Sequence, residues 1–148
     1  MHLYKIQNNY MDDLMSKKIV LTCVCCLNTL LDNIEFIEKS NNEYILPQQV
    51  YDEFIRQNNP KLIKKMVYSK KHDIIQVYDM QIRTDEHKIY KSILNGKLGP
   101  CFGKCESSAI SIAIHNNGVL LTDDNDNIIR NIGNYTLTWL NVNDLIIS

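Results

Sequence analysis

One nearly continuous apolar run of strand length, from Lys18 to Cys26, constrains the fold more than any other feature of the sequence. Strands with one solvated face alternate apolar and polar residues, whereas this run is polar on neither face. Such strands are typical of parallel sheets that helices cover on both faces. The run therefore predicts a central strand of an α/β protein. A helix is expected after it, over Thr29 to Glu38, where leucines and isoleucines recur at helical spacing.

Strands and helices alternate along the rest of the chain. Apolar runs predict strands at 44–46, 73–78, 119–121 and 136–140, and periodic segments predict helices from 48 onward and over 85–94, 106–115 and 126–132. A turn or helix is expected at 142–147. The lysine-rich segment 61–72 is interpreted as a solvated helix face, with phosphate contact as the alternative. This alternation predicts a parallel sheet with helices on both faces.

Length and composition limit the domain organisation and the setting. We expect residues 1–16 to form an N-terminal arm or helix and residues 17–148 to form one domain. The net charge of −1 provides no overall attraction to nucleic acid, so any such binding needs a local patch. No apolar stretch is long enough to span a bilayer, and no secretion signal is evident. Five cysteines without a disulfide-scaffold spacing favour a reducing, cytoplasmic setting.

Acidic residues lie where the carboxyl ends of the predicted strands meet. Asp123 and Asp124 follow a predicted strand, Glu106 opens a helix after a glycine-bearing loop, and Glu53 lies on the helix after the second strand. Open α/β sheets form ligand sites at this edge. Taken singly, Glu106 can compensate the helix dipole and the aspartates can cap a helix. Their joint order favours a site for Mg²⁺ or Mn²⁺, which activate water and neutralise phosphodiester charge.

Two segments carry a resemblance to a known family: YILPQQVYDEF (Tyr44 to Phe54) and GKCESSAISIAIHNNGVLLTDD (Gly103 to Asp124). In these segments and in the order of its elements, the chain resembles the PIN-domain family. Its members are small metal-dependent ribonucleases, and many are toxins of toxin–antitoxin pairs. The family pattern has a Pro-x-x-Val-x-x-Glu helix, then a Gly-x-Gly-Glu turn into a helix rich in small residues. A strand that ends in Asp or Asp-Asp follows.

The resemblance implies a three-layer α/β/α PIN-like domain with a small parallel sheet. It implies catalytic roles for Glu53, Glu106 and Asp123, and one or two Mg²⁺ or Mn²⁺ ions held by these residues and Asp124. It further implies RNA as the substrate, an antitoxin or other protein partner, and a homodimer.

Two positions depart from the family pattern. Thr22 stands where the first strand normally ends in Asp, and Cys105 stands where the turn has its second glycine. A threonine hydroxyl is a weak, neutral metal ligand, so a second hypothesis is a catalytically impaired PIN-like module for binding or interaction. Asp32 or the Asp12–Asp13 pair could replace the missing acid, although Asp32 lies some turns down the predicted helix.

The cysteines leave two interpretations open. In the expected fold, Cys23 and Cys25 approach the loop that carries Cys101 and Cys105, which would suit a zinc or redox site beside the acidic pocket. The spacings C-x-C-C and C-x-x-x-C are not those of zinc ribbons, and successive strand residues face opposite sides. Free cysteines commonly pack as small apolar residues, which is the expectation for these cysteines and for Cys26.

Overall fold

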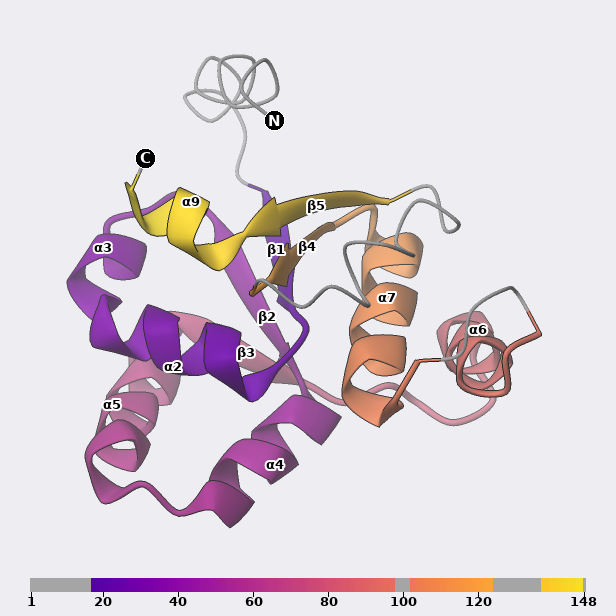
Figure 1. Cartoon of the computed structure of the whole chain (residues 1–148), viewed down its shortest axis with the longest axis horizontal. Coiled ribbons are helices and arrows are strands. Elements are labelled where there is room, and N and C mark those ends of the chain that lie inside the picture. Colours follow the sequence, from indigo (N-terminus) through magenta and orange to yellow (C-terminus); the bar gives the residue numbers. More distant parts are fainter. Residues whose placement is uncertain (1–16, 98–101, 124–136, 148) are drawn as a thin grey trace.

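The computed structural model describes residues 17–97, 102–123 and 137–147 of the chain (Figure 1). Strands and helices alternate through most of it. The strands are β1 (Lys18–Leu21), β2 (Glu43–Pro47), β3 (Ile75–Tyr78), β4 (Val119–Thr122) and β5 (Thr138–Asn141). The helices are α2 (Val24–Asp32), α3 (Ile34–Glu38), α4 (Gln48–Gln57), α5 (Pro60–Lys71), α6 (Asp85–Leu94), α7 (Lys104–Asn116) and α9 (Val142–Ile147).

The five strands form one parallel sheet in the order β3-β2-β1-β4-β5. The central strand, β1, pairs with β2 on one side and β4 on the other, with Val20 opposite Ile45 and Leu120. Residues 19–21 are buried on both faces of the sheet, as the continuous apolar run requires. The expected α/β architecture with a parallel sheet is therefore confirmed.

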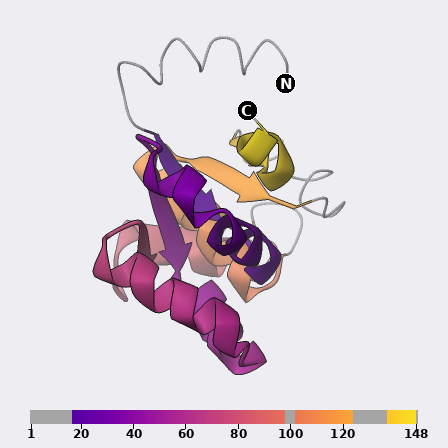
Figure 2. The same cartoon turned by 90° about the vertical axis from the view of Figure 1, so that its left-hand side faces the viewer.

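Helices cover both faces of this sheet and complete three layers. On one face, side chains of α2, α4, α5 and α9 pack with Ile19, Leu21 and Leu46 in the larger part of the core. On the other face, α6 and α7 pack against Val20, Ile45 and Leu120. Figure 1 shows the two groups on opposite sides of the strands, and in Figure 2 the helices of the first group lie in front of the sheet.

The first strand is shorter than the sequence predicts. The prediction of a strand through Cys26 is wrong, because β1 ends at Leu21 and α2 begins at Val24. The backbone N–H of Thr22 donates to the Leu121 carbonyl at 3.2 Å and completes the ladder with β4. Cys23 is still extended but already caps α2, since its sulfur accepts from the backbone N–H of Cys26 at 3.5 Å.

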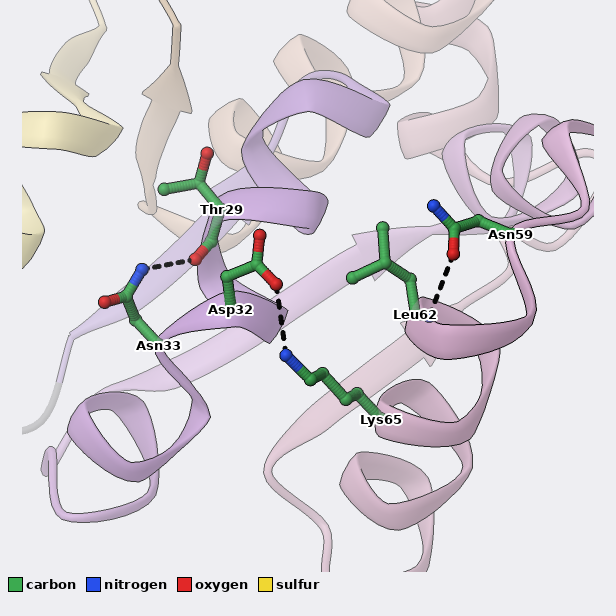
Figure 3. Close-up of polar contacts among 6 residues, drawn as sticks. All are labelled: Thr29, Asp32, Asn33, Asn59, Leu62 and Lys65. Carbon is green, nitrogen blue, oxygen red and sulfur yellow. Dashed lines mark hydrogen bonds and ion pairs between the residues drawn. The ribbon is translucent and has the colours of Figure 1, made fainter.

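The single helix predicted over 29–38 is also wrong, because α2 and α3 are separate helices that meet at Asn33. Asn33 has φ −124° and ψ 37°, which is not helical, and its side chain donates to the Thr29 carbonyl at 2.8 Å. Beside this break, Asp32 forms an ion pair with Lys65 of α5 at 3.1 Å (Figure 3). Asp32 therefore ties α2 to α5 at the end of α2 remote from Cys23.

The other predicted elements are confirmed within one to three residues at their ends where the structure describes them. The lysine-rich segment is helix α5, which buries Leu62 and Met66, and all its lysines except the half-buried Lys65 are exposed. The predicted arm at 1–16 and helix at 126–132 lie outside the described residues. None of the described helices is long and apolar enough to cross a membrane.

Candidate active site

The strand order places a topological switch point between β1 and β4. From β1 the chain first builds β2 and β3 on one side and then β4 and β5 on the other. Crevices at the carboxyl ends of strands on either side of such a point are the usual ligand sites of open α/β sheets. Thr22 and Cys23 follow β1, and Asp123 follows β4, so these residues flank the switch point.

An acidic cavity of about 660 Å³ lies between α4 and α7 beside this point. It contains the carboxylates of Glu53, from α4, and Glu106, from α7, so the structure brings these two predicted site residues together. Asp123 is not among the residues that line the cavity, and Asp124 lies outside the described residues. The lining residues are Gln49, Asp52, Glu53, Arg56, Tyr90, Lys104, Cys105 and Glu106.

The amphipathic pattern of α4 directs Glu53 into the cavity. Val50 and Phe54 are buried against the sheet, so the face that carries Glu53 is turned toward solvent. Its carboxylate forms an ion pair with Arg56 at 2.9 Å, and the side chain is 45% exposed. Exposed pairs of this kind contribute less than about 1 kcal/mol, so the pair yields readily to a stronger ligand.

Glu106 lies in the first turn of α7, where backbone N–H groups favour a negative charge. Its carboxylate folds back over Gly103, the residue that precedes the helix. A Cβ at position 103 would lie 3.0 Å from Oε2 of Glu106, so the glycine leaves room for this conformation. The glycine before the helix and the first turn of α7 therefore position this carboxylate.

Cys105 packs between the two acids and the core. Its thiol donates to the Gln49 carbonyl at 3.6 Å, which links α7 to the first turn of α4. Burial and, to a smaller extent, the nearby charges of Glu106 and Glu53 together raise the pKa of this thiol to about 11. The sulfur therefore stays protonated at neutral pH and takes a packing role.

Thr22 takes a structural role in place of the expected first acid. It is buried, with 2% of its surface exposed, and its hydroxyl donates to the Leu121 carbonyl at 2.9 Å. This bond joins the ends of β1 and β4 at the switch point, where an aspartate has no proton to donate.

A group of thiols lies at the same strand ends. The sulfur atoms of Cys23 and Cys26 are 3.3 Å apart. The nearby charge of Asp123 is a minor influence that acts to raise the pKa of each thiol. Hydrogen bonding from Cys26 outweighs burial and lowers the pKa of Cys23 to about 7. The packing expectation holds for the buried Cys26 but is wrong for Cys25, which is exposed. Cys101 lies outside the described residues.

The donors present suit a hard cation that keeps several of its waters. Mg²⁺ is commonly bound by one or two carboxylates, and Glu53 and Glu106 supply two such groups in one cavity. Within residues 17–97, 102–123 and 137–147, no three His, Cys, Asp or Glu side chains are grouped closely enough to hold a metal ion. An ion held here would therefore rest on these two carboxylates and on its own waters.

Two basic residues of the cavity were missed in the sequence. Arg56 and Lys104 both line it and balance its acids. The sequence held a signal for Arg56, which follows Glu53 by three residues on the same helix face. Lys104 precedes Glu106 by two residues, a spacing that gives no such signal. Neither residue lies in a run of basic residues, which is the sequence pattern that indicates a basic patch.

A buried acid away from the cavity was also missed. Glu86, at the start of α6, is 2% exposed and accepts hydrogen bonds from Tyr78 at 2.7 Å and Asn116 at 3.1 Å. The carboxylate raises the pKa of Tyr78 to about 12. The backbone carbonyl of Glu86 accepts from the Ser111 hydroxyl of α7, so Glu86 joins α6, α7 and the end of β3. No local sequence pattern predicts this hydrogen-bond network.

Comparison with known proteins supports the fold through structure alone. No protein-family model and no curated protein sequence matches the chain. The structure is similar to VapBC2 from Rickettsia felis bound to a DNA fragment from their promoter, with a TM-score of 0.55 and 18% identity over 84% of this chain and 98% of that chain. It is similar to VapBC-1 from nontypeable Haemophilus influenzae, with a TM-score of 0.53 and 16% identity over 85% of this chain and 98% of that chain.

A third similar structure is a PilT N-terminus domain protein from Sulfolobus solfataricus P2. The TM-score is 0.50, with 12% identity over 88% of this chain and 91% of that chain. At these identities the likeness establishes the fold, and the chain has the PIN-like fold that the two sequence segments imply.

Proposed function

We propose that this protein is a PIN-like nuclease that hydrolyses phosphodiester bonds of RNA at the acidic cavity. The observation that carries the proposal is the meeting of Glu53 and Glu106 in one cavity, from helices far apart in the sequence. The PIN-like fold of the similar structures supports it. Asp123, at the end of β4, and Asp124 are the remaining acids of the proposed site.

In this proposal the basic and the acidic side chains of the cavity have different roles. Arg56 and Lys104 provide positive charge at the cavity, where they would contact the phosphate and hold it against the acids. Glu53 and Glu106 would hold a partly hydrated Mg²⁺ or Mn²⁺ ion and orient the attacking water. Asp123 does not line the cavity and would act from the end of β4. When bound, such an ion lowers the pKa of a water and neutralises charge on the phosphate.

The similar structures also support a protein partner. Two of them are VapBC assemblies, and one is bound to a DNA fragment from their promoter. We extend to this chain an antitoxin-like protein partner, a homodimeric arrangement and a cytoplasmic setting.

A second candidate function is a PIN-like binding module without catalysis. Thr22 favours it, because its hydroxyl is committed to the Leu121 carbonyl at 2.9 Å and adds no negative charge to the site. The Glu53–Arg56 ion pair favours it too, because it offsets the charge of one of the three acids that line the cavity.

Cleavage of a defined RNA, with Mn²⁺ or Mg²⁺ added, decides between the two candidates. The nuclease is expected to cleave only with the ion, and Glu106→Gln or Asp123→Asn is expected to lower the rate by more than about 100-fold. Groups that merely orient metal ligands are already worth roughly 10–100-fold. Glu35→Gln, on the surface of α3, is the matched control and should leave the rate unchanged.

Cleavage that survives both EDTA and Asp123→Asn contradicts the nuclease. No cleavage by the wild-type chain, together with cleavage gained by Thr22→Asp, establishes the second candidate.

A further inference from the structure

Cys23 and Cys26 form a Cys-x-x-Cys pair across the first turn of α2. Cys23 is the N-cap and Cys26 is the third residue of the helix, so the two side chains lie on the same face. Their sulfur atoms are 3.3 Å apart. A disulfide brings sulfur atoms to about 2.05 Å, so a small rotation of the side chains suffices to join them.

The two thiols differ in their access to solvent. Cys23 is half-buried and therefore open to a partner molecule, whereas Cys26 is fully buried. Behind the pair, the Cys26 thiol is within reach of the Leu121 carbonyl at 3.5 Å. Only the first cysteine can meet an external reactant, and only the second is placed to react with the first.

The surroundings of Cys23 favour its thiolate. The backbone N–H of Cys26 donates to its sulfur at 3.5 Å, and the N-terminus of α2 favours a negative charge there. The Cys26 thiol donates to the same sulfur when Cys23 ionises, and this hydrogen bond is the largest cause of its lowered pKa. Thiolates at helix N-termini are the reactive form of cysteine in thiol–disulfide exchange.

We propose that Cys23 and Cys26 are a redox-active dithiol that reduces disulfides by thiol–disulfide exchange, with Cys23 as the attacking residue and Cys26 as the resolving residue. The substrate class is a disulfide of a protein or of a low-molecular-weight thiol. The reaction needs neither RNA nor a metal ion, so it stands separately from the proposed nuclease.

The exchange proceeds in two balanced steps. The Cys23 thiolate attacks one sulfur of the incoming disulfide, forms a mixed disulfide and expels the other sulfur as a thiolate, which takes the proton of Cys26. The Cys26 thiolate then attacks the Cys23 sulfur, closes the Cys23–Cys26 bond and expels the second thiolate, which takes from solvent the proton that Cys23 released on ionising. Two electrons and two protons pass from the pair to the incoming disulfide.

Mass spectrometry of the full-length chain treated with oxidised glutathione at pH 7, with EDTA present, tests this reaction. The wild-type chain is expected to lose two hydrogens and retain no glutathione, with peptide mapping placing the new bond between Cys23 and Cys26. Cys26→Ser is expected to retain one glutathione on Cys23, because the resolving thiol is missing. Cys23→Ser is expected to slow the reaction at least about tenfold.

Cys25→Ser is the matched control, because Cys25 lies between the pair and is exposed. It should leave the loss of two hydrogens unchanged. The proposal is overturned if wild-type chain keeps glutathione on Cys23 without closing the bond, or if Cys25 or Cys105 is the residue that reacts. In a second sample without EDTA, the proposal is equally overturned if stoichiometric Zn²⁺ binds the reduced pair and blocks the exchange, which would make the pair a metal site.

Discussion

Cys23 and Cys105 both lie at the N-terminal ends of helices near the switch point, yet their thiol pKa values are shifted in opposite directions. The pKa of Cys23 is lowered to about 7 and that of Cys105 is raised to about 11. The difference comes from the atoms that face each sulfur. Cys23 accepts from the backbone N–H of Cys26, whereas Cys105 points at the Gln49 carbonyl and has Glu106 and Glu53 nearby.

This contrast shows that a helix N-terminus does not by itself activate a thiol. The N-cap position of Cys23 directs the sulfur at the free N–H groups of the first turn. Cys105 is the second residue of α7, and its side chain turns away from those groups toward α4. One edge of the sheet therefore holds a thiol of lowered pKa beside an acidic cavity whose own thiol has a raised pKa.

The difference between the Cys23 and Cys105 thiols is tested most directly by measuring how fast each one is alkylated. At pH 7, iodoacetamide should alkylate Cys23 about 100-fold faster than Cys105, because the larger thiolate fraction outweighs the lower nucleophilicity of a low-pKa thiolate. Peptide mapping by mass spectrometry after timed quenching gives both rates. Equal rates would show that the two helix ends do not differ chemically.

Thr22→Asp would turn the thiol end of the site into an acidic one. The aspartate loses the bond to the Leu121 carbonyl and places a buried charge against that oxygen. We expect the free energy of unfolding to fall by about 2–3 kcal/mol without divalent cations. Saturating Mn²⁺ should return part of this loss, because an ion that binds only the folded state stabilises it.

Chemical denaturation with and without Mn²⁺ measures both effects. Thr22→Val removes the same hydrogen bond without adding charge and serves as the control, so its stabilisation by Mn²⁺ should match that of the wild-type chain and stay below that of Thr22→Asp. An unchanged stability of Thr22→Asp would mean that the hydroxyl does not hold the strand ends together.

The lowered pKa of Cys23 also predicts a pH dependence of stability. A thiol whose pKa falls from its ordinary value of 9.0 to about 7 on folding stabilises the protein fully above pH 9. The gain is lost as the pH falls through 7, because the thiol is then protonated in both states. Relative to Cys23→Ser, the wild-type chain should gain about 1–2 kcal/mol between pH 6 and pH 9.

Denaturation under reducing conditions across this range measures the difference. Cys25→Ser should follow the wild-type curve, because it keeps the Cys23 thiol. A flat difference between the wild-type chain and Cys23→Ser would place the Cys23 pKa at its ordinary value.

The smallest expected effect lies at the other end of α2. Asp32→Asn removes the ion pair with Lys65, which is 3.1 Å long and has the aspartate 57% exposed (Figure 3). Such pairs contribute less than about 1 kcal/mol, and we expect a loss of about 0.5 kcal/mol in urea denaturation, reduced further by salt. The alkylation rate of Cys23 should not change. A changed rate would mean that both ends of α2 act on the thiol.

The predictions that succeeded from sequence rest on local periodicity. The apolar run at 19–21, the spacing of Val50 and Phe54, and the small buried residues of α7 each reflect a face turned to the core. These patterns depend only on residues close together in the sequence, so they predict a parallel sheet with helices on both faces. The rule that strand ends share one edge predicts Glu53, Glu106 and Asp123 together. Glu53 and Glu106 line one cavity but Asp123 does not, and the roles of all three stay predictions.

The predictions that failed depended on where one element stops. A strand through Cys26 predicts the side chains of Cys23 and Cys26 on opposite faces, so in a strand their Cys-x-x-Cys spacing does not bring the sulfur atoms together. Once α2 begins at Val24, the same four residues form a helical turn and the two sulfur atoms lie 3.3 Å apart. Sequence determined the layers, because burial follows a local period. Only the tertiary structure decided which thiol is reactive, because the N–H groups, carbonyls and carboxylates around each sulfur come from segments brought together by folding.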